Sequence, residues 1–104
     1  MNSLENSIAA AWDNPELRSK AETIEAIEKV VDLVDKGELR TAEPKADGSW
    51  QVNEWVKKAI VMYFPLRQMA VSEVGIFEYY DKLRLKSNYK ALGVRVVPPA
   101  VARY

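Results

Sequence analysis

The fold of this 104-residue chain is decided by residues 47–65, which read DGSWQVNEWVKKAIVMYFP. The Asp-Gly pair near the start of the stretch predicts a tight turn, because glycine accepts the positive φ angles that such turns require. Asn53 is a suitable helix N-cap, and Pro65 ends the helix because it has no N–H to donate. Residues 59–64 carry no charge, and a helix that is apolar all round is buried. We therefore predict a core helix over residues 53–64.

The chain before this helix is predicted to form two helices within residues 1–36 and a short β-hairpin over residues 38–52. Apolar residues recur at helical spacing in both helices, and Gly37 is placed to end the second one in a left-handed conformation. A lone hairpin is marginal in water, so it should pack on a helix. Trp50 is the expected anchor, because an aromatic side chain buries a large area.

The chain after the core helix shows weaker patterns. Residues 65–93 are predicted to form loops and a short helix that Gly93 ends. Residues 94–104 are predicted to be an extended linker that approaches another structure, because Pro98-Pro99 forces an extended conformation. The whole chain is thus predicted to be one small domain of the α+β class, mainly helical, with about three main helices and a short β-hairpin.

The amino-acid composition excludes several kinds of chemistry. The chain contains no His and no Cys, so it cannot hold a Ser-His-Asp triad, a Cys nucleophile or a Cys/His zinc site. Its four glycines are far apart and cannot form a phosphate-binding loop. No apolar run is long enough for a transmembrane helix, and the lack of Cys makes a cytoplasmic location the simplest expectation.

The charges are balanced overall but unevenly distributed. Residues 1–52 hold six Lys/Arg and eleven Asp/Glu, whereas residues 53–104 hold nine and four. The basic second half is compatible with an anionic ligand, and the two halves could equally attract each other across the fold. Nucleic-acid binding is not expected, because domains with that function are usually basic overall.

Four segments, in order along nearly the whole chain, resemble one known family. They are GELRTAE at residues 37–43, GSW at 48–50 with WVKKAI at 55–60, YDK at 80–82, and GVRVVPPA at 93–100. On these segments the chain resembles the N-terminal domain of tetrahydrodipicolinate N-succinyltransferase. That family is the acyltransferase of the succinylase branch of lysine and diaminopimelate biosynthesis.

The resemblance implies a longer protein than this chain. Family members continue past the Pro-Pro pair into a left-handed parallel β-helix, which assembles into a homotrimer and is not contained in residues 1–104. Succinyl-CoA, the co-substrate, and the cyclic dicarboxylate substrate meet there, between neighbouring subunits. We therefore expect no catalytic, cofactor-binding or metal-binding residue in this chain, no tightly bound cofactor, and no activity of the chain alone.

Arg95 is the one site residue that the resemblance assigns, because it matches a family arginine associated with binding of the dicarboxylate. A guanidinium is a planar, permanently charged fork that fits a carboxylate with two hydrogen bonds. The extended flanks Val96-Val97 and Pro98-Pro99 would hold it at low entropic cost. The alternative is an ordinary surface arginine on a strand.

Two charged pairs are weaker candidates. Lys57 and Lys58 could contact a phosphate-bearing cofactor, but lysines at the start of a buried helix more often form its solvated edge. Asp81 and Lys82 are more often a structural ion pair or a turn than an acid/base pair.

A different class of function remains open from the sequence. Trp12, Trp50 or Trp55 could expose an apolar patch, in which case the chain would be a stand-alone protein-interaction or oligomerisation module without catalysis.

Overall fold

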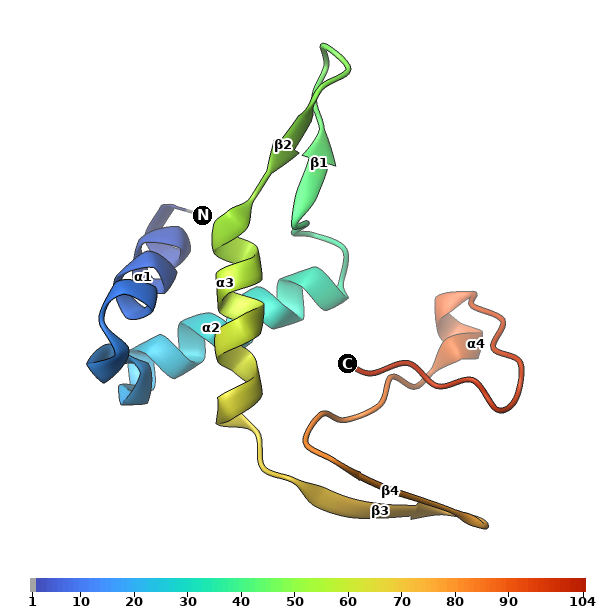
Figure 1. Cartoon of the computed structure of the whole chain (residues 1–104). Coiled ribbons are helices and arrows are strands. Elements are labelled where there is room, and N and C mark those ends of the chain that lie inside the picture. Colours follow the sequence, from blue (N-terminus) through green and yellow to red (C-terminus); the bar gives the residue numbers. More distant parts are fainter. Residues whose placement is uncertain (1) are drawn as a thin grey trace. The chain divides into compact units, whose positions relative to one another are not determined.

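The computed structural model describes residues 2–104 and divides the chain into two compact units, Met1–Leu66 and Arg67–Tyr104 (Figure 1). We call them the first unit and the second unit. The sequence predicts a single domain over the same residues. The division has a simple physical reason: every buried residue that the structure describes lies at or before Tyr63, so the hydrophobic core ends with the first unit.

The first unit is built from three helices and one hairpin. The elements are α1 (Asn2–Asp13), the 3-10 helix η1 (Pro15–Ser19), α2 (Ala21–Asp35), β1 (Ala42–Pro44), β2 (Trp50–Val52), α3 (Glu54–Tyr63) and the 3-10 helix η2 (Phe64–Leu66). Each of the three α-helices contacts the other two, and α3 crosses α2 in Figure 1. The mainly helical α+β class with three main helices and a short hairpin is therefore confirmed.

The core lies between the three helices. Its largest fully buried side chains are Ile8 of α1, Ile27 and Val30 of α2, and Val56 of α3. The core helix was expected to be buried all round, and this expectation is wrong. Within the first unit, α1 and α2 pack against one face of α3, where the helix buries Val56, Ala59, Met62 and Tyr63. Another face leaves Val61 48% exposed.

The end of α2 follows the sequence prediction. Gly37 has a φ angle of +76°, its N–H donates to the carbonyl of Val34 (3.0 Å), and the next N–H, of Glu38, donates to the carbonyl of Leu33 (2.9 Å). This pair of bonds is the Schellman motif, which satisfies carbonyls that the helix end would leave unpaired.

The start of α3 differs from its prediction. The Asn53 side chain makes no capping bond to the helix. Its amide Nδ2 instead donates to the carbonyl of Arg40 at 2.8 Å and to the Glu43 carboxylate at 3.4 Å, and its backbone N–H donates to the carbonyl of Thr41 at 2.7 Å. Asn53 therefore fastens the base of the hairpin to the first turn of α3.

The β1–β2 hairpin is present where it was predicted, but Trp50 does not anchor it. The register pairs Ala42 with Val52 and Pro44 with Trp50, which places these four apolar residues on one face of the hairpin. Trp50 is 60% and Val52 61% exposed. The hairpin is held at its base by Asn53 rather than by packing of its tip.

The second unit contains a hairpin that the sequence prediction missed. Strands β3 (Ala70–Val74) and β4 (Phe77–Asp81) pair antiparallel, whereas loops are predicted over residues 65–93 apart from a short helix. Strand β3 lacks a clean alternation of apolar and polar residues, and its pairing with β4 decides its conformation. The short helix is α4 (Tyr89–Leu92), which Gly93 ends with a φ angle of +72°.

The last residues do not form the predicted extended linker. Residues 94–97 form no strand, the Pro98-Pro99 peptide bond is cis, and the chain then returns to residues 84–86. Lys86 N–H donates to the carbonyl of Ala102 (2.7 Å), and Tyr104 N–H donates to the carbonyl of Arg84 (2.8 Å). Backbone pairing within the second unit therefore shapes this segment. None of the helices in residues 2–104 has the length and apolarity needed to cross a membrane.

Candidate functional site

Arg95 lies on the second unit, in the irregular segment between α4 and the Pro-Pro pair. The residue is exposed, and among residues 2–104 its guanidinium makes no hydrogen bond or ion pair. Residues 94–97 form no strand, so Arg95 is not a strand-surface arginine, which was the alternative interpretation.

Lys57 and Lys58 differ in their surroundings. Lys57 is exposed, whereas Lys58 is half-buried, and its Nζ lies 5.6 Å from the centroid of the Trp12 ring. The Arg18 guanidinium carbon lies at the same distance from that ring. Cations at this range from an aromatic ring are attracted by its quadrupole. Lys58 thus contributes to the packing of α3 against α1.

Arg18 is a structural residue that the sequence analysis missed. Its Nε donates to the carbonyl of Ala11 and its Nη2 to the carbonyl of Trp12, both at 2.9 Å. Both carbonyls lie at the C-terminal end of α1, where no following turn of the helix supplies an N–H donor for them. A cation at a helix C-terminus also interacts favourably with the helix dipole.

We expect Arg18→Ala to lower the free energy of unfolding by about 2 kcal/mol, because two charge-assisted hydrogen bonds to part-buried carbonyls are lost. Urea denaturation followed by circular dichroism measures the change. Arg40→Ala is the matched control, since the Arg40 side chain is exposed and only its backbone carbonyl is used. Equal stability of the two variants would contradict this role for Arg18.

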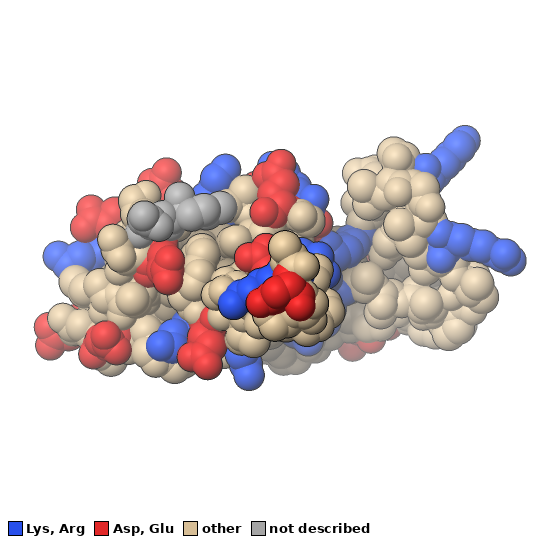
Figure 2. Space-filling model, turned by 90° about the horizontal axis from the view of Figure 1, so that it is seen from above, with Lys and Arg blue, Asp and Glu red and all other residues tan. Residues whose placement is uncertain are grey.

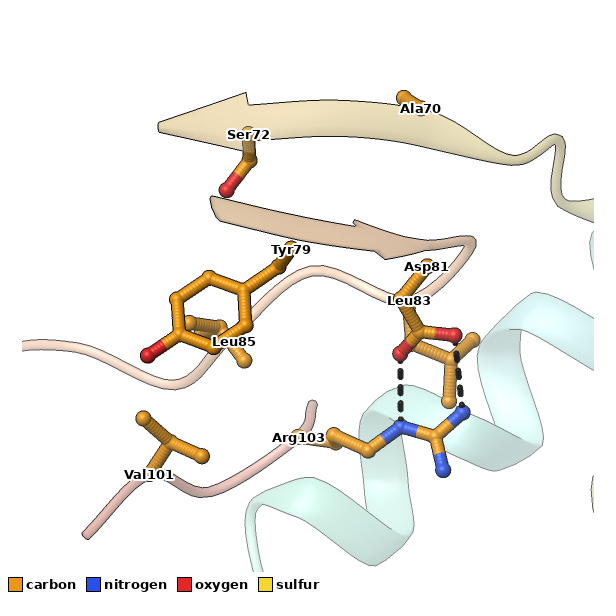
Figure 3. A pocket seen from close by; sticks show the side chains of 8 residues that line it. All are labelled: Ala70, Ser72, Tyr79, Asp81, Leu83, Leu85, Val101 and Arg103. Atoms are coloured by element: carbon orange, nitrogen blue, oxygen red, sulfur yellow. Dashed lines mark hydrogen bonds and ion pairs between the residues drawn. The ribbon is translucent and has the colours of Figure 1, made fainter. Parts of the chain in front are cut away.

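Asp81 and Lys82 do not act as a pair. The Asp81 carboxylate faces Arg103, with Oδ2 3.0 Å from Nε and Oδ1 3.4 Å from Nη2 (Figure 3). The carbonyl of Lys82 accepts a bond of 3.4 Å from Arg67 Nε. Arg103 lies 22 residues from Asp81 in the sequence, so the spacing of neighbouring residues could not predict this ion pair.

A pocket of about 250 Å³ lies beside this ion pair (Figure 3). It is formed by one face of the β3–β4 hairpin and by two later segments, and its lining residues are Ala70, Ser72, Tyr79, Asp81, Leu83, Leu85, Val101 and Arg103. Asp81 and Arg103 neutralise each other at its wall. The remaining lining is apolar except for two hydroxyl groups, and Arg95 is not part of it.

Two other cations of the second unit, Arg84 and Lys86, lie over an aromatic ring of the same unit. The Arg84 guanidinium carbon lies 3.6 Å and Lys86 Nζ 5.4 Å from the centroid of the Tyr104 ring. Figure 2 shows Asp and Glu interspersed with Lys and Arg over much of the face that it presents.

The turn of the first hairpin carries a perturbed carboxyl group. The Ser49 hydroxyl (2.5 Å) and then the Ser49 N–H (2.9 Å) donate to Asp47 Oδ1, and these bonds hold the pKa of Asp47 below its ordinary value. A group whose pKa is lowered by folding stabilises the fold at neutral pH, and this contribution is lost as the pH falls through the lowered pKa.

We expect Ser49→Ala to raise the pKa of Asp47 toward its ordinary value, because the hydroxyl bond is the largest cause of the shift. NMR of the side-chain carboxyl carbon against pH measures the midpoint. Ser19→Ala, whose hydroxyl bonds the Glu16 carbonyl instead, should leave the midpoint of Asp47 in place. A midpoint that Ser49→Ala does not move would contradict the assignment.

Comparisons with known proteins give one consistent match. Residues 3–66, which fall within the first unit, match the family described as tetrahydrodipicolinate N-succinyltransferase N-terminal. The chain is 41% identical to the 2,3,4,5-tetrahydropyridine-2,6-dicarboxylate N-succinyltransferase of Bordetella pertussis, over 96% of this chain and 40% of that protein. The proteins of the same name from Granulibacter bethesdensis (41% identical) and Alkalilimnicola ehrlichii (39% identical) align with 99% of this chain. The chain spans about 40% of the length of these relatives.

Proposed function

The chain belongs to the tetrahydrodipicolinate N-succinyltransferase family, and we propose that the complete protein transfers the succinyl group of succinyl-CoA to the amino group of tetrahydrodipicolinate. One observation carries this proposal. Relatives with this name are about 40% identical to the chain over nearly its whole length. The reaction would belong to lysine and diaminopimelate biosynthesis.

The proposed chemistry needs no nucleophile from the protein. Tetrahydrodipicolinate is a cyclic imine, so water first adds to its C=N bond and gives an amine. The amine nitrogen then attacks the thioester carbonyl of succinyl-CoA, so that an N–C bond forms, the C–S bond breaks and CoA leaves as its thiolate. A general base takes the proton from the nitrogen, and the enzyme holds the two substrates in a reactive orientation. A chain without His and Cys can belong to such an enzyme because its part would be binding and support.

Arg95 is the residue of this chain that we assign to the substrate. Its exposed guanidinium has no partner among residues 2–104, and it can form two charge-assisted hydrogen bonds with one carboxylate of the substrate. We assign the general base and the succinyl-CoA site to the part of the complete protein outside this chain. That part would form a left-handed β-helix and a cytoplasmic homotrimer, and the chain alone would be inactive.

The test is the product formed by the complete protein. Tetrahydrodipicolinate and succinyl-CoA are incubated with it, and mass spectrometry is expected to detect an acceptor that has gained one succinyl group and one molecule of water, with release of stoichiometric free CoA. Acetyl-CoA in place of succinyl-CoA should give much less product. Release of CoA that does not depend on the acceptor would refute the proposed reaction.

A second candidate function is favoured by the β1–β2 hairpin. Its apolar face, with Trp50 and Val52 each about 60% exposed, would suit an interaction or oligomerisation module. Sedimentation of the 104-residue chain at increasing concentration tests this candidate. Self-association that Trp50→Ala abolishes would support it.

A further inference from the structure

We infer that the second unit is a docking element, whose pocket and β3–β4 hairpin are covered by the polypeptide that follows Tyr104 in the complete protein. This inference rests on the proposed function, which supplies that polypeptide. It adds a partner and a role for residues 67–104, to which the family match over residues 3–66 does not extend.

The first observation is that the second unit has no core. None of the residues 67–104 is buried, and the hairpin leaves Val71 58%, Phe77 51% and Tyr80 65% exposed. Units of roughly 40 residues or fewer usually need disulfides, metals or association to fold. The unit has no Cys, and no cluster of metal ligands occurs among residues 2–104. Packing against other polypeptide is therefore the source of stability that we propose for this unit.

The second observation is the chemistry of the pocket. Asp81 and Arg103 satisfy each other, so the pocket offers no unpaired charge to an ionic ligand. Its other walls are mainly apolar and include Leu83, Leu85 and Val101 (Figure 3). A cavity of about 150 Å³ with apolar walls can hold a benzene molecule. The present volume of about 250 Å³ therefore suits one or two large apolar side chains.

The third observation identifies the occupant. The segment of Val101 and Arg103 lines the pocket, and the backbone bond from Tyr104 to Arg84 holds the following residue at the same wall. Polypeptide that continues from Tyr104 therefore starts beside the pocket. Tethering gives such a segment a high effective concentration, which a separate partner lacks. The relatives are about 2.5 times as long as the matched region, since that region is 40% of their length.

Hydrogen–deuterium exchange of the hairpin amides tests the inference. The complete protein and the 104-residue chain are compared at equal concentration. In the 104-residue chain, residues 70–81 should exchange nearly as fast as an unstructured peptide, and in the complete protein at least about tenfold more slowly. Leu85→Asp, which places a charge in the pocket, should restore fast exchange in the complete protein. Leu92→Asp is the matched control, because Leu92 is 63% exposed and does not line the pocket.

Three results would overturn the inference. They are equal protection of the hairpin in both lengths of protein, protection in the 104-residue chain that rises with its concentration, and continued protection in the Leu85→Asp variant. The second result would assign the surface to another copy of the chain. The test is separate from the proposed reaction: a complete protein that protects the hairpin but forms no succinylated product would refute the reaction only, and the reverse outcome would refute the docking only.

Discussion

Arg95→Ala in the complete protein is expected to lower kcat/KM for tetrahydrodipicolinate by about 100-fold. The substitution removes two charge-assisted hydrogen bonds to a carboxylate, and a loss of about 3 kcal/mol corresponds to a factor of this size. The effect should fall mainly on KM for the dicarboxylate, because the carboxylate is charged in both the ground state and the transition state. The KM for succinyl-CoA should stay within about twofold.

Two control variants separate binding from general electrostatics. Arg95→Lys keeps the charge but not the planar fork, so it should recover only part of the loss. Lys90→Ala removes another exposed cation of the second unit and should leave the kinetics unchanged. Because the exposed Arg95 guanidinium makes no hydrogen bond or ion pair within residues 2–104, its alanine variant should also keep the melting temperature. An unchanged KM for the dicarboxylate would remove Arg95 from the site.

Ile27→Ala is expected to give the largest loss of stability. Ile27 is fully buried in the three-helix core, and truncation of a buried isoleucine costs about 2–5 kcal/mol through lost transfer energy and the cavity that remains. A unit of this length is stable by only about 3–10 kcal/mol, so the variant should be partly unfolded at 37 °C. Urea denaturation followed by helical circular dichroism measures the change.

The matched control for this prediction is Ile76→Ala. Ile76 is 94% exposed at the turn of the second hairpin, and a surface substitution of this kind changes stability by less than about 0.5 kcal/mol. If Ile27→Ala were as mild as Ile76→Ala, the core would not lie between α1, α2 and α3.

Features fixed by neighbouring residues could be predicted from the sequence. The Asp47-Gly48 pair does form the hairpin turn, with the Gly48 N–H bonded to the Lys45 carbonyl at 3.1 Å. Gly37 and Gly93 do end helices in the left-handed conformation. In each case the requirement is a positive φ angle at one position, and glycine satisfies it without help from distant residues.

Features fixed by distant residues could not be predicted in this way. Strand β3 depends on its register with β4, and the ion pair of Asp81 depends on the return of residues 101–104. Asn53 has the chemistry of an N-cap, but the carbonyl of Arg40, 13 residues away, takes its amide instead. Trp50 fails as an anchor because the register places it on a hairpin face that no helix of the first unit covers.

Arg95 was predicted to bind the substrate because of a family resemblance, and not because of its neighbouring residues. An arginine between two valines has the pattern of an ordinary strand surface. The structure adds that its guanidinium is exposed and has no partner among the described residues. The role of Arg18 could not be predicted from the sequence, because its two acceptors are backbone carbonyls, which no side-chain pattern reveals.

We propose that this chain is one part of an N-succinyltransferase whose chemistry is completed by the rest of the protein. The most direct measurement assays the complete protein and the 104-residue chain side by side, with succinyl-CoA and tetrahydrodipicolinate, for acceptor-dependent release of CoA. We expect turnover by the complete protein and none above background by the chain alone. Turnover by the 104-residue chain, or no turnover by a folded complete protein, would contradict it.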